Sequence, residues 1–338
     1  MPMEQQELTE RLAQFIREQG GFGKVEIENF RRMAGGASRE IWSFDAALEK
    51  NGATAKRALV LRRDPGEHRI DTNRKAEFLV LRAAHREGVP VPEVLWVSDD
   101  PAVLGAAFFI MERVEGETLA RRLLRDAEYE HAREVMPAQL AEILAKIHRV
   151  DPQKHQLDFL TPPGDNAALT EVRRYEENFR RLALEPHPAF DLAFRWLLSR
   201  IPKTPRQTLV HGDYRIGNVI FGPAGVRSIL DWELAHLGDP MEDVGWMCVR
   251  AWRFGNDRKP VGGLGSREDF FEAYEKASGV RVDPEAAHFW EVFGNLRWGI
   301  ITISQARTHI DGFVKSIELA SIGRRTAETE LELLNLIE

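Results

Sequence analysis

The sequence predicts an α+β chain with two lobes, a mainly β lobe over residues 1–115 and a mainly helical lobe over residues 116–338. Three observations support this. The 338 residues are enough for two domains. Short apolar runs of strand type are concentrated before about residue 115. After Gly116 the apolar residues recur at helical spacing.

The first lobe begins with an amphipathic helix predicted over residues 8–19. Leu8, Leu12, Phe15 and Ile16 would share one face of this helix, and Gly20-Gly21 would end it. The elements expected after it are strands at 40–44 and 58–61, a helix at 74–86, and buried strands at 94–97 and 106–111.

In the second lobe, Pro137 is expected to open a helix that carries Leu140, Ile143, Leu144 and Ile147 on one face. Further helices are predicted at 170–184, 188–200, 241–253, 267–278, 284–306 and 313–336. Only residues 208–232 carry strand and turn signals, with a hairpin turn at 222–225. Trp290, Phe293, Trp298 and Ile300, on the helix at 284–306, are expected to be core, with a role in an acceptor pocket as the alternative.

Composition excludes several classes of function. The 46 basic and 53 acidic residues give a net charge of −7, whereas a nucleic-acid-binding domain is usually basic. No apolar run reaches the ~18 residues of a membrane span, and the polar N-terminus does not resemble a signal peptide. The single cysteine, Cys248, rules out an internal disulfide and predicts a buried thiol. We therefore expect a cytoplasmic protein without nucleic-acid or membrane partners.

The residues that suggest chemistry lie between 209 and 233. Asp213 and Asn218 precede one strand-like piece, and Asp231 follows the next. A hairpin between the two pieces would bring these oxygen ligands together, as Mg²⁺ requires, and would leave Asp213 as a base. Each residue alone is typical of a turn or a cap, whereas the whole array favours a functional site.

The motif His211-Gly-Asp-Tyr-Arg-Ile-Gly-Asn218, followed by Ile229-Leu-Asp-Trp-Glu233, resembles the signature of the aminoglycoside phosphotransferase and choline kinase superfamily. The resemblance covers roughly residues 25–330. It implies a two-lobed, protein-kinase-like fold, with an antiparallel sheet plus a helix in the N-lobe and a mainly helical C-lobe. It also implies transfer of the γ-phosphoryl group of ATP to a hydroxyl of a small molecule.

The resemblance further assigns roles around the motif. Asp213 matches the catalytic base, Asn218 and Asp231 match the Mg²⁺ ligands, and His211 matches a residue that supports the loop. Downstream, Asp239 and Asp243 match acids that brace it. Arg215, two residues after the base, would stabilise charge on the phosphoryl group; a surface ion pair is the alternative.

In the N-lobe the resemblance points to the nucleotide. Arg62 stands where the family's ATP-binding Lys is expected, and Glu77 matches its acidic partner. The turn that contains Gly36 and Ser38 would cover the phosphates with backbone N–H groups. Residues 112–114, including Glu112 and Val114, fall where the adenine-contacting hinge should run.

Within the superfamily, the segments 231–240, 249–255 and 294–298 are most similar to the branch that accompanies acyl-CoA dehydrogenases. That branch implies a hydroxyacyl-CoA acceptor. Arg250, Arg253, Arg258 and Lys259 are compatible with its phosphates, and a solvated loop is the alternative. An aminoglycoside kinase or another small-molecule kinase, and a nucleotide-binding pseudoenzyme that regulates a partner, remain open, as do ATP against GTP and the oligomeric state.

Overall fold

The computed structural model describes residues 4–33, 40–64 and 74–338, and the chain divides into two compact units. The first unit contains Met1–Gly116 together with Arg227–Glu233. The second contains Glu117–Val226 and Leu234–Glu338. The short segment 227–233, which lies far along the chain, therefore groups with the N-terminal unit.

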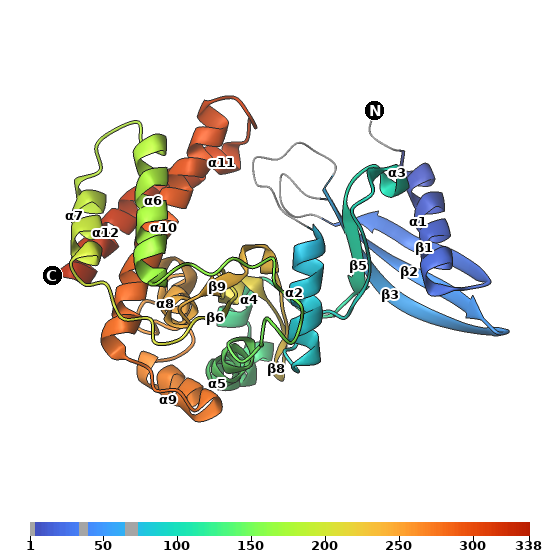
Figure 1. Ribbon diagram of the computed structural model, residues 1–338, viewed down its shortest axis with the longest axis horizontal. Helices are drawn as coiled ribbons and strands as arrows, with labels where there is room; N and C mark the ends of the chain where they lie inside the picture. The colour runs from blue at the N-terminus through green and yellow to red at the C-terminus, as the bar shows by residue number, and fades with distance from the viewer. Residues whose placement is uncertain (1–3, 34–39, 65–73) are drawn as a thin grey trace. The chain divides into compact units, whose positions relative to one another are not determined.

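The first unit is built on a five-stranded antiparallel sheet, counted over its described residues, with the order β1-β2-β3-β5-β4 (Figure 1). In the described part of this unit, two helices and one helical turn accompany the sheet. The elements are α1 Gln5–Gly20, β1 Lys24–Arg32, β2 Glu40–Lys50, β3 Ala53–Arg63, α2 Arg74–Arg86, β4 Val94–Ser98, α3 Pro101–Leu104 and β5 Phe108–Glu112.

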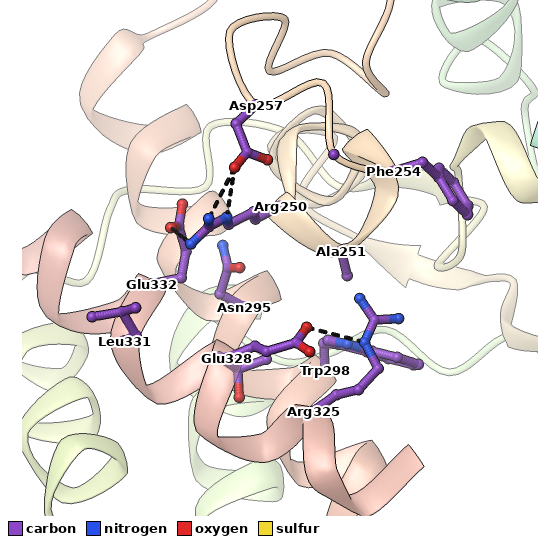
Figure 2. Close-up of a pocket in the computed structure, with 12 residues that line it drawn as sticks. Arg250, Ala251, Phe254, Asp257, Asn295, Trp298, Arg325, Glu328, Leu331 and Glu332 are labelled. Atoms are coloured by element: carbon purple, nitrogen blue, oxygen red, sulfur yellow. Dashed lines mark hydrogen bonds and ion pairs between the residues drawn. The ribbon is translucent and has the colours of Figure 1, made fainter. Parts of the chain in front are cut away.

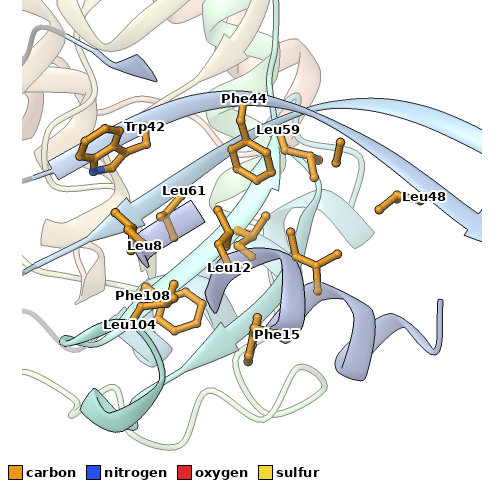
Figure 3. Packing of buried hydrophobic residues seen from close by; sticks show 13 residues of the cluster. Leu8, Leu12, Phe15, Trp42, Phe44, Leu48, Leu59, Leu61, Leu104 and Phe108 are labelled. Carbon is orange, nitrogen blue, oxygen red and sulfur yellow. The ribbon is translucent and has the colours of Figure 1, made fainter. Parts of the chain in front are cut away.

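Helix α1 packs against one face of this sheet, and the four residues predicted for its apolar face are all buried. Figure 3 shows Leu8, Leu12 and Phe15 of α1 meeting side chains of β2, β3 and β5. Side chains alternate along a strand. Leu59 and Leu61 therefore point toward α1, and Arg62, the residue after Leu61, points to the opposite face, where it meets Glu77 of α2.

The second unit is mainly helical. Its central helix is α10, which packs against α6, α7, α8, α11 and α12. The helices are α4 Ala120–Arg125, α5 Glu130–Ile147, α6 Ala167–Leu182, α7 Pro188–Leu198, α8 Met241–Cys248, α9 Arg267–Ser278, α10 Pro284–Ile310, α11 Ile317–Ile322 and α12 Thr326–Ile337, with 3₁₀ turns at Ala127–Tyr129, Ile216–Asn218, Arg250–Arg253 and Gly323–Arg325.

Between α7 and α8 the chain forms short strands. β6 Thr208–Val210 pairs antiparallel with β9 His236–Gly238. β7 Val219–Gly222 pairs with β8 Gly225–Ile229, which confirms the predicted hairpin. A further 3₁₀ turn, Trp232–Leu234, follows β8. These short pieces carry the motif residues of the sequence.

The α+β class is confirmed, and several predicted helices are corrected. Pro137 does not open a helix but lies inside α5, because Ala132 and Met136, both fully buried, extend the apolar face ahead of it. The predicted helix 241–253 ends at Cys248, since Val249 is extended. The predicted helix 313–336 is broken at Gly323, with Ser316 capping its first part. Among the described helices, none is long and apolar enough to cross a bilayer.

Candidate active site

The backbone of the loop that follows β6 is hydrogen-bonded to a buried carboxylate. Asp243, on the first turn of α8, is fully buried and accepts hydrogen bonds from the backbone N–H groups of His211 (2.7 Å) and Gly212 (2.9 Å). His148 contacts the same carboxylate at 3.2 Å. Burial raises the pKa of Asp243, but the hydrogen bond and charge of His148 outweigh it, so the net pKa lies below the ordinary value. Asp243 thus remains an anion that fixes two successive peptide groups.

Asp213 is the residue toward which this loop is organised. Its Oδ1 accepts hydrogen bonds from Arg215 Nε (2.9 Å) and Trp246 Nε1 (2.8 Å), and its Oδ2 accepts one from Asn218 Nδ2 (2.6 Å). Its backbone N–H donates to His211 Nδ1 at 3.1 Å. Both oxygens of one carboxylate are therefore held by directed donors. The three predicted residues Asp213, Arg215 and Asn218 come together in the second unit.

Among the described residues, the amide nitrogen of Asn218 donates only to Asp213. Nδ2 donates to the Asp213 carboxylate and also to the Asp213 carbonyl oxygen (3.0 Å). The side chain is buried at the end of the 3₁₀ turn Ile216–Asn218. Because both contacts engage the nitrogen, Oδ1 is the atom of this amide that is suited to a cation.

A second group of predicted residues meets in the first unit. Arg62 is buried and contacts Glu77 (2.6 Å), Asp231 (3.1 Å) and Glu233 (3.2 Å). Burial lowers the pKa of Arg62, but the charges of Glu77 and Asp231 more than offset it, so the net pKa is raised. Arg62 is therefore a fixed cation among three carboxylates.

Two further observations concern this group. Glu77 also pairs with Arg74, which is fully buried and pairs in turn with Asp64. Asp231 has a backbone φ of 66°. A non-glycine residue in this left-handed region is uncommon, and such residues cluster at functional sites. The unusual backbone at Asp231 supports a functional role for this acid.

The remaining predicted nucleotide residues are placed as follows. Glu112 ends β5, where its carboxylate pairs with Arg57 (2.5 Å). Val114, half-buried, follows beyond the strand. Gly36 and Ser38 lie outside the described residues.

The basic stretch 250–259 is more internally paired than its composition suggests. Arg250 contacts Asp257 (2.9 Å) and Glu332 (3.2 Å). Arg253, which the solvated-loop alternative places in water, is buried and contacts Glu291 (2.9 Å) and the carbonyl of Cys248. Only Arg258 and Lys259 of the four predicted cations are largely exposed.

Arg250 borders a pocket of about 300 Å³ in the second unit (Figure 2). Trp298 and Arg325 line the same pocket, with the guanidinium of Arg325 5.7 Å from the Trp298 ring. Of the four aromatic and aliphatic residues singled out on α10, Trp290, Phe293 and Ile300 are core, whereas Trp298 contributes to this pocket.

Several residues that contact the motif were not assigned a role from the sequence. Glu233, which belongs to the motif, and Arg74 join the Arg62 group, and Trp246 donates to Asp213. Arg297, fully buried on α10, donates to the carbonyl oxygen of Gly212 at 2.7 Å. Trp246 follows Asp243 by one helical turn, which is a spacing that could have indicated it. Arg297 lies in the segment 294–298 that the sequence comparison quotes, but its distance of 84 residues from Asp213 gives no sign that it contacts the loop.

Comparison with known proteins gives one matching family model. Residues 34–288 match the family described as the phosphotransferase enzyme family. Acyl-CoA dehydrogenase family member 10 from Mus musculus is 35% identical over 199 residues, which are 58% of this chain and 18% of that protein. Acyl-CoA dehydrogenase family member 11 from Pongo abelii is 29% identical over 227 residues, 64% of this chain and 28% of that protein. The chain thus spans less than a third of the length of these relatives.

Solved structures match over the whole chain. A candidate aminoglycoside phosphotransferase from Ralstonia eutropha JMP134 is 26% identical with a TM-score of 0.77, and the match covers 97% of this chain and 98% of that one. Spectinomycin phosphotransferase APH(9)-Ia, in complex with ADP and spectinomycin, has a TM-score of 0.64 at 12% identity, with 99% of both chains covered. At that identity the second likeness concerns the fold alone.

Proposed function

Because this chain belongs to the phosphotransferase enzyme family, we propose that it transfers the γ-phosphoryl group of ATP to a hydroxyl group of a small molecule. The observation that carries the proposal is the Asp213 carboxylate, whose two oxygens are held by Arg215, Trp246 and Asn218. Such fixed orientation is what a base requires to receive the proton of an attacking hydroxyl.

Asp213 acts as the base, and Arg215 acts beside it. The side chain of Asp213 is 14% exposed, so an acceptor hydroxyl can reach it. Arg215 lies against Asp213 through Nε and stacks on Trp252 at 4.5 Å. A guanidinium in this position neutralises charge that develops on the transferring phosphoryl group.

Asn218 and Asp231 are the proposed magnesium ligands. They offer an amide oxygen and carboxylate oxygens, the hard donors that Mg²⁺ prefers. Within the described residues no group of three or more His, Cys, Asp or Glu forms a metal cluster, and a Mg²⁺ held by one or two side chains together with substrate phosphates needs none. When bound, the ion neutralises charge on the phosphates.

Arg62, which is oriented by Glu77, is proposed to hold the phosphates that are not transferred. Glu77 fixes one edge of the Arg62 guanidinium, and the other edge points to Asp231. A planar guanidinium can bind phosphate oxygens in a bidentate manner. Glu112 and Val114 remain the proposed adenine contacts, and Gly36 and Ser38 the proposed phosphate turn. Spectinomycin phosphotransferase APH(9)-Ia, which shares the fold, was solved with ADP, and on that likeness of fold we propose a nucleotide for this chain.

For the acceptor we propose a hydroxyacyl-CoA, on the ground that the curated relatives are acyl-CoA dehydrogenase family members. Arg258 and Lys259 are the exposed cations suited to its phosphates, since Arg250 and Arg253 already face carboxylates. An aminoglycoside is the second candidate, favoured by the Ralstonia structure that matches over its full length. The single buried thiol of Cys248 is consistent with action in the cytoplasm.

The test is ADP release from Mg-ATP with a panel of hydroxyacyl-CoAs, aminoglycosides, choline and simple sugars. Asp213→Ala should lower turnover at least ~10³-fold, because the base is lost, while a nonhydrolysable ATP analogue still binds within about threefold of wild type. Asp158→Ala, a change at an exposed acid of the same unit, serves as the matched control and should leave turnover unaltered.

The outcomes separate the candidates. Turnover with a hydroxyacyl-CoA supports the full proposal, and turnover only with an aminoglycoside or a sugar keeps the chemistry but replaces the acceptor. Near-normal turnover in Asp213→Ala would show that the base is assigned wrongly. Nucleotide binding without turnover on any acceptor would favour a pseudoenzyme that regulates a partner.

A further inference from the structure

Arg297 is a buried cation that the proposed chemistry does not use. It lies at the middle of α10 and is 2% exposed. Burial lowers the pKa of Arg297, but neighbours that include Tyr175, Glu242 and Asp213 outweigh it, so the net pKa is raised. A charge buried to this degree is costly unless its partners are specific, so its contacts indicate what it holds.

The contacts of Arg297 are directed at the loop of Asp213. Nη2 donates to the carbonyl oxygen of Gly212, the residue before Asp213, at 2.7 Å. Nη1 donates to Glu242 Oε1 at 2.9 Å. The guanidinium also stacks on the ring of Trp246 at 4.5 Å. One side chain therefore fixes both the peptide before Asp213 and the indole beside it.

Trp246 links Arg297 to the Asp213 carboxylate. Trp246 is 3% exposed, and its Nε1–H donates to Asp213 Oδ1 at 2.8 Å. The position of that N–H depends on how the ring sits on the guanidinium. The loop is thus fixed at two points. Asp243 accepts hydrogen bonds from the backbone N–H groups of His211 and Gly212, and Arg297 donates to the carbonyl oxygen of Gly212.

We propose that Arg297 is a positioning residue that acts through Gly212 and Trp246 to fix the orientation of the Asp213 carboxylate. The proposal rests on the proposed function, in which Asp213 is the base. Planarity is essential to it, because only a guanidinium can donate to a carbonyl, pair with a carboxylate and stack on a ring at once. Lysine at this position keeps the charge near Glu242 but loses the stacking and the fork.

The first test reads the geometry without turnover. The indole N–H of Trp246 is assigned in a ¹⁵N–¹H spectrum as the signal lost in Trp246→Phe. In the wild type we expect its exchange with solvent to be slow. Asp213→Ala and Arg297→Lys should each accelerate this exchange at least ~10-fold, because the acceptor or the stacked support is lost. Unchanged exchange in Arg297→Lys would overturn the proposal.

The second test reads the chemistry. Trp246→Phe keeps an aromatic ring and removes the donor, so it should lower kcat about 10- to 100-fold and change the KM for ATP less than about threefold. Arg297→Lys should likewise lower kcat while changing the KM for ATP little. Because the two residues act in series, the double variant should lose no more kcat than the single variant with the larger loss. Equal losses in kcat and in nucleotide affinity, or additive losses, would contradict the inference.

The control is Trp196→Phe. Trp196 also stacks on an arginine, Arg200 at 4.7 Å, and contacts His288 rather than the Asp213 loop. This variant should match the wild type in kcat and in the exchange of Trp246. Urea unfolding shows whether Arg297→Lys is folded, and Trp246→Phe carries the test if it is not. If the Trp246 N–H exchanges slowly but no acceptor is turned over, the proposed phosphotransferase activity is rejected, and the proposed positioning of Asp213 by Arg297 is retained.

Discussion

A partly exposed acid and a fully buried acid are balanced differently in the two units. In the first unit, Asp231 shares the Arg62 cation with Glu77, so its charge is balanced by a side chain. In the second, Asp243 faces two backbone N–H groups and a histidine, so His148 and the peptide groups of the loop balance its charge together. The second arrangement orders the chain itself, because each hydrogen bond fixes a backbone group.

Asp243→Asn should therefore be strongly destabilising. An amide has one oxygen for the three donors that the carboxylate accepts, and its NH₂ group would face a backbone N–H. We expect the free energy of unfolding in urea to fall by about 3 kcal/mol. Asp158→Asn, at an exposed site, is the control and should stay within ~0.5 kcal/mol of wild type. Equal stability of the two variants would mean that the loop does not depend on this carboxylate.

At the scale of elements, the loop after β6 comes very close to the segment before β9. Gly212 has a φ of 78°, and a Cβ there would lie 2.5 Å from the carbonyl oxygen of Leu234. The obstacle is backbone, which cannot move aside as a flexible side chain can. Glycine is thus required by both conformation and space.

Gly212→Ala should lower the free energy of unfolding by about 3 kcal/mol or more, and it should also lower turnover. Gly279→Ala separates the two causes. Its φ of 72° is equally unfavourable, but no atom lies within 4 Å of the added carbon. It should cost about 1 kcal/mol and leave kcat unaltered. Similar losses at the two positions would show that the close approach to Leu234 is unimportant.

The elements that the sequence predicted well are those with strong periodicity. The helix at 74–86 matches α2 in both bounds, and the hairpin at 222–225 is confirmed. Strands β2 and β3 are longer than predicted, because Asn51-Gly52, a hairpin turn with positive φ at both residues, went unrecognised. The error at Pro137 arose where tertiary burial overrode a local signal. At Gly323 the continuous helix was predicted across a glycine, which is a poor helix former, and the helix breaks there.

In the candidate site, only the residues that lie close together along the chain could be identified from the sequence. Asp213, Arg215 and Asn218 lie within six residues of each other, so a motif captures them. Trp246 and Arg297 reach the same loop from two helices, and only packing brings them there. Sequence reasoning therefore indicates the residues proposed to react but misses the buried groups that orient them.

At the scale of the whole molecule, the stability should depend on pH through His236. Its Nδ1 lies 2.8 Å from the carbonyl oxygen of Leu234, and its Nε2 lies 3.1 Å from Glu242. Both ring nitrogens thus face acceptors, which favours the imidazolium. Burial lowers the pKa of His236, but Glu242 outweighs it, and the pKa is raised to about 9.

The sign follows from linkage. The folded state holds a proton on His236 that the unfolded chain, with a pKa near ~6.5, releases earlier. Its contribution to stability is complete below about pH 6.5 and is lost as the pH rises through about 9. We expect the free energy of unfolding to fall by about 3 kcal/mol between pH 6.5 and 9.5. His236→Gln should remove most of this slope, whereas His131→Gln, at an exposed site, should retain it. A slope that persists in His236→Gln would assign the pH dependence to other groups.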